Sequence, residues 1–340
     1  MLAAPSPAAL KAKLTKLIQR HPHWETGISV WFLQGDKITE KVDINGAQPL
    51  ALASVFKVPV LVELARQMQR KQGGLQLSSG LSITESEKCI GSGRLQHQRA
   101  GTVVSVERLI ELMELSSDNT ATDMLFHRIG VASVNKLLEE LGCNHSDIAL
   151  TNRAAWLISL GQSSDFRSLS PEQVAKKWTK MSRDEHAKAA ARAEKENLKL
   201  SLRKFQDLEN RSDRTQTHEQ NVLVATTVDN LSSSADLATV LTQLYQGKVL
   251  NREMTRFCLR ILSRQHFNTR IPRNLPEGTL VYHKTGTIAG VVNDIGIIEI
   301  PDVGSVVVVA LVNQVGRGES SQADEFIAQV ARAAYDELLR

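Results

Sequence analysis

The chain has 340 residues, of which 42% are apolar and 23% charged, the usage of a soluble globular protein of about two domains. The longest unbroken apolar run, Val306–Val312, is far shorter than the roughly 20 residues of a membrane-spanning helix. A net charge of +4 with only 4% aromatic residues argues against a nucleic-acid-binding surface. The first residues, MLAAPSPAALKAKL, lack the apolar stretch of a signal peptide, so we expect a cytoplasmic chain or one trimmed from an exported form.

The N-terminal part is predicted to form a helix followed by a hairpin. Apolar residues at helical spacing predict a helix over 8–20, and residues 27–33 and 38–44 predict two strands joined by a turn. A further helix is predicted over 54–69, ended by Gly73 and Gly74.

The middle of the chain is predicted to be helical. Residues 105–141 predict two or three helices, broken at 116–119. The segment 170–221 is highly charged, with 12 basic and 9 acidic residues between Glu172 and Glu219. Mixed charges of this kind predict one or two solvent-facing helices with a narrow apolar stripe. Another helix is predicted over 232–245.

The C-terminal part is rich in strands. Strands are predicted over 279–283, 291–300 and 305–313, with turns at 284–290 and 301–304, and residues 322–339 predict a closing helix. We expect an α+β protein in which strands from both ends form one antiparallel sheet flanked by helices. The predicted sheet domain comprises residues 1–50 and 265–340, and an inserted all-helical domain comprises 51–264, with a charged insertion at about 170–220.

Ser54 and Lys57 stand three residues apart at the start of a predicted helix, which places a hydroxyl and an amine on one face. A serine is a poor nucleophile until a base takes its proton, and a lysine can act as that base only when its pKa is lowered. Backbone N–H groups at a helix N-terminus could also stabilise an oxyanion. The motif alone is weak, because Ser-x-x-Lys also occurs at 133–136 and 201–204.

Two further motifs strengthen this interpretation. Ser117-Asp118-Asn119 lies at a predicted helix break, where its side chains can reach a cleft, although alone it could be a helix cap. Lys284-Thr285-Gly286 follows a predicted strand and offers a cation, a hydroxyl and a glycine where backbone passes close to a ligand, although alone it could be a turn. Each triplet occurs once, and together with Ser54 they indicate a catalytic site.

The cysteines, Cys89, Cys143 and Cys258, are far apart and show no zinc-binding spacing. His21 and His23 lie close together without a third ligand nearby. We therefore expect no metal and no cofactor, and we expect a monomer that acts on a small-molecule substrate.

With these motifs the chain resembles the penicillin-recognising serine enzymes, and among them the class A β-lactamases. The resemblance covers about 26–144 and 221–340, and further matching stretches are GSGRLQ at 91–96, SSDNTATDML at 116–125, NTRIPRNLPEGT at 268–279 and HKTGT at 283–287. It implies the β-lactamase/transpeptidase-like fold, with an active site between the sheet domain and the helical domain.

The resemblance implies a role for each catalytic residue. Ser54 would be the acylated nucleophile and Lys57 its proton partner, while Ser117 would relay a proton to the leaving nitrogen. Lys284 would hold the substrate carboxylate.

It also implies the residues that bind the substrate. Thr285 would hold the carboxylate beside Lys284, and Asn119 would bind the side-chain amide. The backbone N–H groups of Ser54 and Thr287 would form the oxyanion hole. Arg270 stands where some members place an arginine for the same carboxylate, but it could equally be a surface residue.

One part of the family pattern is missing. Class A enzymes carry Glu-x-x-x-Asn on a loop, whose glutamate activates the water that hydrolyses the acyl-enzyme. The match at Glu140–Asn144 falls at the end of a predicted helix before that loop, and we interpret it as coincidence. We therefore expect slow deacylation, unless Asp165, Glu172 or another acid replaces the base.

Three functions stay open. The first is a serine hydrolase or acyltransferase that forms an acyl-enzyme at Ser54 with β-lactams or related amides and esters. The second is a D-alanyl-D-alanine carboxypeptidase or an esterase. The third is a non-catalytic binding protein that keeps the cleft.

Overall fold

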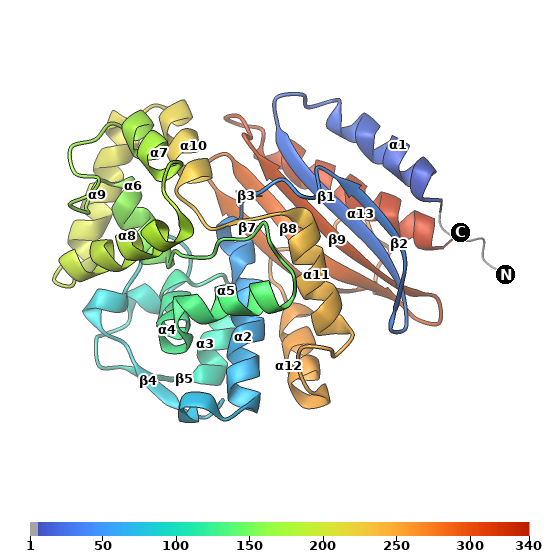
Figure 1. The fold of residues 1–340 in the computed structure, drawn as a ribbon, viewed down its shortest axis with the longest axis horizontal. Coiled ribbons are helices and arrows are strands. Elements are labelled where there is room, and N and C mark those ends of the chain that lie inside the picture. Colours follow the sequence, from blue (N-terminus) through green and yellow to red (C-terminus); the bar gives the residue numbers. More distant parts are fainter. Residues whose placement is uncertain (1–5, 340) are drawn as a thin grey trace.

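Strands from both ends of the chain pair side by side in the computed structural model, which describes residues 6–339. Within these residues a five-stranded antiparallel sheet has the order β2-β1-β9-β8-β7 (Figure 1). Its strands are β1 (Glu25–Gln34), β2 (Lys37–Ile44), β7 (Leu280–Ile288), β8 (Val291–Ile300) and β9 (Gly304–Asn313). The predicted α+β class and the joining of terminal strands are confirmed.

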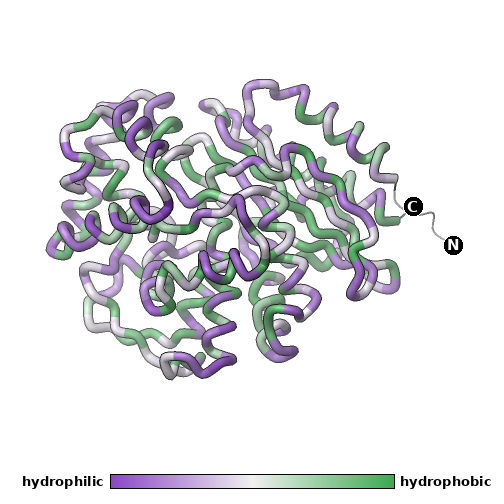
Figure 2. The backbone as a smooth tube through the Cα atoms, in the orientation of Figure 1, coloured by the Kyte–Doolittle hydropathy of each residue, from purple (hydrophilic) through white to green (hydrophobic). Residues whose placement is uncertain are grey.

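The sheet is buried on both faces because its strands are apolar on both. Along β9, Val306 and Val308 pack with α1 (Pro7–Ile18) and α13 (Ser320–Leu338), whereas Val307 faces the other core. Successive side chains of a strand point to opposite faces, so this valine run serves two cores at once. Figure 2 shows hydrophobic residues along the central strands.

The second face of the sheet packs against helices from the middle of the chain. These are α2 (Lys57–Gln69), α3 (Val106–Leu115), α4 (Asn119–Ile129), α5 (Val131–Glu140), α11 (Ser234–Tyr245) and α12 (Arg252–Leu262). Helix α2 is buried from Lys57 to Met68 and forms the centre of this layer. Short strand pairs brace it: β3 (Leu50–Ala51) with β6 (Leu231–Ser232), and β4 (Gly80–Ser82) with β5 (Val103–Ser105).

The charged segment forms more helices than its composition predicts. These are α7 (Pro171–Trp178), α8 (Arg183–Glu196), α9 (Leu202–Thr215) and α10 (His218–Thr227). Each begins at a serine or threonine whose side chain accepts a backbone N–H, and three of these caps are reciprocal capping boxes. Such caps satisfy the free N–H groups of a helix start and so divide the segment into short helices.

The charged segment also has its own apolar core. Val174, Trp178 and Phe205 are buried against α6 (Asn152–Ser159), a helix that was not predicted from the sequence. The apolar stripe of α9 is narrow, as predicted, because Phe205 is the residue of this helix whose side chain is buried. The charged segment therefore packs over α6 with its apolar side chains and presents its charged side chains to solvent.

One predicted turn is wrong. Residues 284–288 continue strand β7 to Ile288, paired with β8, so the turn is confined to the residues before Val291. The predicted domain limits at residues 51 and 264 stay predictions. Across residues 6–339, no helix combines the length and the apolar character that a bilayer crossing requires.

Candidate active site

Ser54 lies in a 3-10 turn, Ala53–Phe56, that leads directly into α2. Ala53 holds a left-handed backbone conformation with φ of 46°. The carboxylate of Asp229 accepts a hydrogen bond from the Ala53 N–H at 2.6 Å, and Asn293 of β8 donates to the Leu52 carbonyl at 3.0 Å. The turn that presents the serine hydroxyl is therefore fixed from two sides.

Gly286 lets β7 pass against this turn. A Cβ at this position would lie 2.6 Å from the carbonyl oxygen of Leu52 and 3.0 Å from the Ser54 nitrogen. The sequence motif predicts a glycine that makes room for a ligand. Instead the glycine makes room for the backbone that carries Ser54.

A shared hydroxyl group joins two buried lysines behind the turn. The Lys57 Nζ donates to the Ser117 Oγ at 3.0 Å and to the Ser117 carbonyl at 2.8 Å. The Lys284 Nζ donates to the same Oγ at 3.1 Å. Ser117 also has a left-handed backbone, with φ of 56°, at the break between α3 and α4. The three motifs predicted to form one site thus meet at this hydroxyl.

The environment of the lysines changes their proton affinity. Burial, together with the charge of Lys284, lowers the pKa of Lys57 to about 7. Burial lowers the pKa of Lys284 to about 8. Near neutral pH, the Lys57 amine can therefore take up a proton while the Lys284 amine keeps its positive charge.

The other two residues of the Ser-Asp-Asn motif have different partners. The Asn119 Oδ1 accepts from Lys57 at 3.1 Å, and its Nδ2 donates to the Ile90 carbonyl at 2.9 Å. Asp118 accepts from the Leu95 N–H at 2.8 Å and so holds the GSGRLQ loop against the helix break. The motif therefore combines one residue that contacts both lysines with two whose hydrogen bonds fix the neighbouring backbone.

Arg270 lies beside the end of β7 and is buried, not exposed at the surface. Its guanidinium pairs with Asp324 at 2.6 Å and donates to the Thr287 Oγ1 at 2.6 Å and to the Asn293 carbonyl at 2.6 Å. Thr285, on the same strand, is 6% exposed. The arginine thus adjoins the predicted carboxylate-binding strand and supports the Thr287 hydroxyl.

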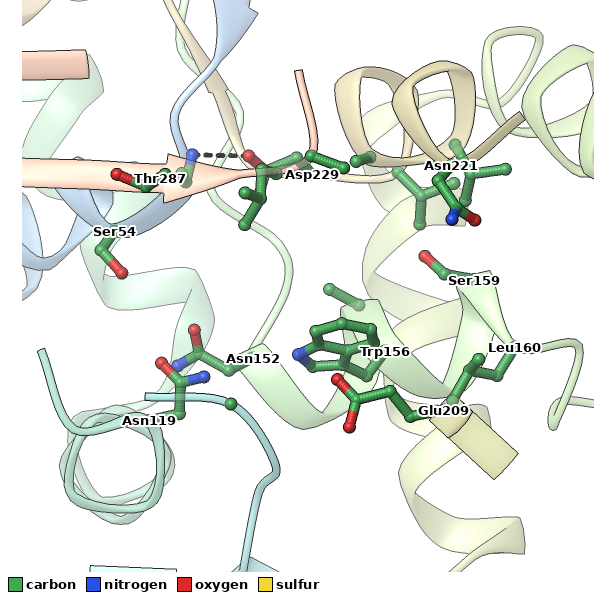
Figure 3. A pocket seen from close by; sticks show the side chains of 18 of the residues that line it. Ser54, Asn119, Asn152, Trp156, Ser159, Leu160, Glu209, Asn221, Asp229 and Thr287 are labelled. Carbon is green, nitrogen blue, oxygen red and sulfur yellow. Dashed lines mark hydrogen bonds between the residues drawn. The ribbon is translucent and has the colours of Figure 1, made fainter. Parts of the chain in front are cut away.

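Ser54 opens onto a cleft of about 280 Å³ (Figure 3). Asn119 and Thr287 line its near end, and Lys57, Ser117 and Lys284 are buried beneath it. Four further lining residues were not predicted from the sequence because they belong to no motif: Asn152 and Trp156 on α6, Glu209 on α9, and Asp229. Figure 3 shows Asn152 beside Asn119 below Ser54, with Trp156 and Glu209 farther along the cleft.

The acids considered as replacement bases lie outside the cleft lining. Asp165 pairs with Arg192, and Glu172 accepts from Gln220. Glu140, which belongs to the Glu-x-x-x-Asn match interpreted as coincidence, pairs with Arg66 on α2 and also lies outside the lining. Among the described residues, the carboxylates that line the cleft are Glu209, Asp213 and Asp229. Burial raises the pKa of Asp229 to about 7, and its carboxylate is held by the Ala53 N–H.

The three cysteines are buried and unpaired. In the part of the chain that the structure describes, no three histidine, cysteine or acidic side chains lie together in a way that could hold a metal ion.

Comparisons with known proteins agree with the motifs. The profile of the "Beta-lactamase enzyme family" matches residues 9–199 and 191–338. The extended-spectrum β-lactamase PER-1 of Pseudomonas aeruginosa is 25% identical over 321 residues, covering 91% of this chain and 81% of PER-1.

Solved structures share the fold. A point mutant of PBP-A, an acyl-enzyme complex with penicillin G, aligns with a TM-score of 0.68 at 22% identity, covering 98% of both chains. The extended-spectrum β-lactamase TLA-1 aligns at 0.70 with 17% identity over 98% of this chain and 99% of its own. A β-lactamase from Sphaerobacter thermophilus aligns at 0.69 with 21% identity over 98% of both chains. The chain therefore belongs to the beta-lactamase enzyme family, as its Ser-x-x-Lys, Ser-Asp-Asn and Lys-Thr-Gly motifs predict, and is a serine hydrolase of the acyl-enzyme type.

Proposed function

We propose that β-lactams or related amides and esters acylate this enzyme at Ser54. The observation that carries the proposal is the Ser117 hydroxyl, which accepts hydrogen bonds from both Lys57 and Lys284 behind the serine. A base with a pKa near 7 and a cation with a pKa near 8 suit a nucleophilic serine and an anionic substrate.

In the proposed reaction, the Ser54 Oγ attacks the substrate carbonyl carbon while neutral Lys57 takes the hydroxyl proton. The C–N bond then breaks, and Ser117 passes its hydroxyl proton to the leaving nitrogen while it takes up the proton that Lys57 received from Ser54. The hydrogen bond from Lys57 to the Ser117 Oγ, at 3.0 Å, supports this path, because it joins the base to the relay. The new ester links Ser54 to the substrate acyl group.

The binding roles follow the geometry of the cleft. We assign the oxyanion hole to the backbone N–H groups of Ser54 and Thr287, which Gly286 allows to approach. Lys284 and Thr285 hold the substrate carboxylate, with Arg270 supporting it through the Thr287 hydroxyl.

Asn119 binds the substrate's side-chain amide. Its place in the cleft lining supports this role, and its bonds to Lys57 and Ile90 hold its amide in one orientation.

We also propose that hydrolysis of the acyl-enzyme is slow. Helix α6 presents Asn152, Ala155 and Trp156 to the cleft, and an amide or an indole cannot serve as a general base. Of the carboxylates that line the cleft among the described residues, Asp229 accepts the Ala53 N–H, whereas Glu209 and Asp213 lie on α9, with Glu209 next to Trp156 in Figure 3. A positioned general base contributes about 10²–10⁴-fold, so we expect deacylation to be slower by about that factor.

The lack of a recognisable deacylating base on α6 also supports a second candidate function, a D-alanyl-D-alanine carboxypeptidase or an esterase. PBP-A shares the fold, and a point mutant of it is described as an acyl-enzyme complex with penicillin G. Turnover of a chromogenic cephalosporin compared with that of a D-Ala-D-Ala peptide separates the two functions. The buried lysine pair argues against the third alternative, a binding protein without catalysis, since burying two amines is costly without a use for them.

Labelling with a fluorescent penicillin tests the acylation site. Wild-type protein should take up the label covalently, and Ser54→Ala should not. Ser133→Ala and Ser201→Ala are matched controls, because Ser133 bonds to the Ile129 carbonyl and Ser201 caps α9. Label on Ser54→Ala would reject the nucleophile assignment.

A further inference from the structure

A buried carboxylate lies on the last turn of α3, three residues before Ser117. The side chain of Glu114 is 0% exposed, and neither of its carboxylate oxygens has a hydrogen-bond partner among the described residues. An unpaired buried carboxylate is costly, so such a group is expected to interact with nearby charge. The proposed reaction gives it no role.

The elements around Glu114 bring two cations to it. Lys57 of α2 and Lys284 of β7 both interact electrostatically with its carboxylate. On the remaining side α12 contributes the buried thiol of Cys258, and Gln265 after that helix donates to the Glu114 carbonyl at 2.8 Å. The other charges that act on the two lysines are Asp118 and Asp123 on Lys57, and Asp294 and Arg270 on Lys284.

We propose that Glu114 is a positioning residue for acylation, a buried anion that keeps one proton on the pair formed by Lys57 and Lys284. The proposed reaction needs Lys57 neutral and Lys284 protonated. With Glu114 ionised, that arrangement leaves the buried group of three residues with no net charge. Without the anion, a lone buried ammonium would be uncompensated and would lose its proton more readily.

The direction of the effect follows from the signs of the charges. The Glu114 charge raises the pKa of both lysines, against the lowering by burial. Burial raises the pKa of Glu114 itself to about 7, so the anion acts most strongly above neutral pH. Removing the anion should lower both lysine pKa values. The pKa of Lys284 should fall more, because Lys284 titrates above neutral pH, where Glu114 is ionised.

The inference rests on acylation at Ser54 and is tested by the pH profile of that step. In Glu114→Gln the alkaline limb should move down by roughly one pH unit, and the acid limb should move in the same direction by less. The two profiles should therefore cross, with the variant faster in acid and slower in alkali. Glu114→Asp keeps the charge and should return the limbs toward their wild-type positions. Glu107→Gln removes an exposed charge from the same helix and is the control.

A merely structural role would lower the whole profile and leave its limbs in place, and that result would overturn the proposal. Lysine side-chain NMR provides a readout that needs no substrate: both lysine signals should titrate at lower pH in Glu114→Gln, and unchanged titration would also overturn the proposal.

If wild-type protein takes no penicillin but the lysine titration shifts, the acylation proposal fails while the charge role of Glu114 stands. If Glu114→Gln does not fold, wild-type lysine signals that follow the Glu114 carboxyl titration support the proposal, and independent titration rejects it.

Discussion

Ala53 and Ser117 adopt left-handed backbone conformations, although neither is glycine. Such a conformation costs about 1–3 kcal/mol and persists only where surrounding contacts hold it. Asp229 holds Ala53 through its N–H, and two lysines hold Ser117 through its hydroxyl. The strained residues therefore stand next to the proposed nucleophile, Ser54, and at the proposed proton relay, where orientation matters most.

Acylation should depend on pH with a bell-shaped profile. The rate should rise as Lys57 loses its proton near pH 7, because only the neutral amine can take the proton of Ser54. It should fall as Lys284 loses its proton near pH 8, because a neutral amine no longer attracts the substrate carboxylate. The acylation rate constant measured across the acid, neutral and alkaline range checks this. A rate that still rises well above the Lys284 pKa would contradict the assigned roles.

Replacing Arg270 should slow acylation while the protein stays folded. The arginine donates to the Thr287 hydroxyl at the end of β7 where we propose the oxyanion hole, and a charge-assisted hydrogen bond is worth roughly 1.5–3 kcal/mol. Arg270→Ala should then reduce the acylation rate about tenfold or more. Arg273→Ala is the control, because Arg273 is about half exposed and pairs with Glu325 at the surface. Equal rates in both variants would remove Arg270 from the site.

At the scale of elements, the contact between β7 and the turn before α2 should be sensitive to a single methyl group. Gly286→Ala places a Cβ 2.6 Å from the Leu52 carbonyl oxygen, which is backbone and cannot rotate away. The strand must shift, and the Thr287 N–H moves with it. We expect a large loss of acylation rate with a smaller loss of stability, measured by penicillin labelling and thermal unfolding. Labelling at the wild-type rate would show that the close approach is not required.

The charged segment should stabilise the enzyme through its small core. Phe205 is fully buried beneath the guanidinium of Arg153, whose carbon lies 5.0 Å from the ring centre. Phe205→Ala should lower the free energy of unfolding by about 3–5 kcal/mol, as for other buried aromatic residues. Leu198→Ala, at a position 58% exposed, should change it little. Urea unfolding curves compare the two, and similar small losses would mean that the segment is only a solvated cover.

For the whole molecule, periodicity predicted the elements that have a strong pattern. The strands of β8 and β9 and the sheet that joins both ends of the chain follow from apolar runs and their order. The extension of β7 was missed because Lys284 and Thr285 are typical of a turn, although an edge strand accepts polar residues. The charged segment is predicted to hold one or two helices but forms four, because reciprocal capping boxes start α7, α8 and α10 and carry the signal there, not hydrophobicity.

The candidate site could be predicted where a motif carried it. Lys57, Ser117 and Lys284 meet at the Ser117 hydroxyl, and Ser54 lines the cleft three residues before Lys57, because short motifs keep their residue types at a fixed spacing. Glu114 and the lining residues of α6 and α9 belong to no motif, since folding alone brings them to their places: Glu114 is buried where the charges of both lysines reach it, and the others reach the cleft from a distant segment.

We expect Ser54 to be acylated quickly and deacylated slowly. Intact-protein mass spectrometry after mixing with benzylpenicillin measures both steps on one sample. The mass should increase by one penicillin molecule, an increase absent from Ser54→Ala, and it should persist for minutes or longer after free penicillin is removed. Rapid turnover of the drug with no detectable adduct would contradict this expectation, because a carboxylate of the cleft, such as Asp229, would then have to act as the base.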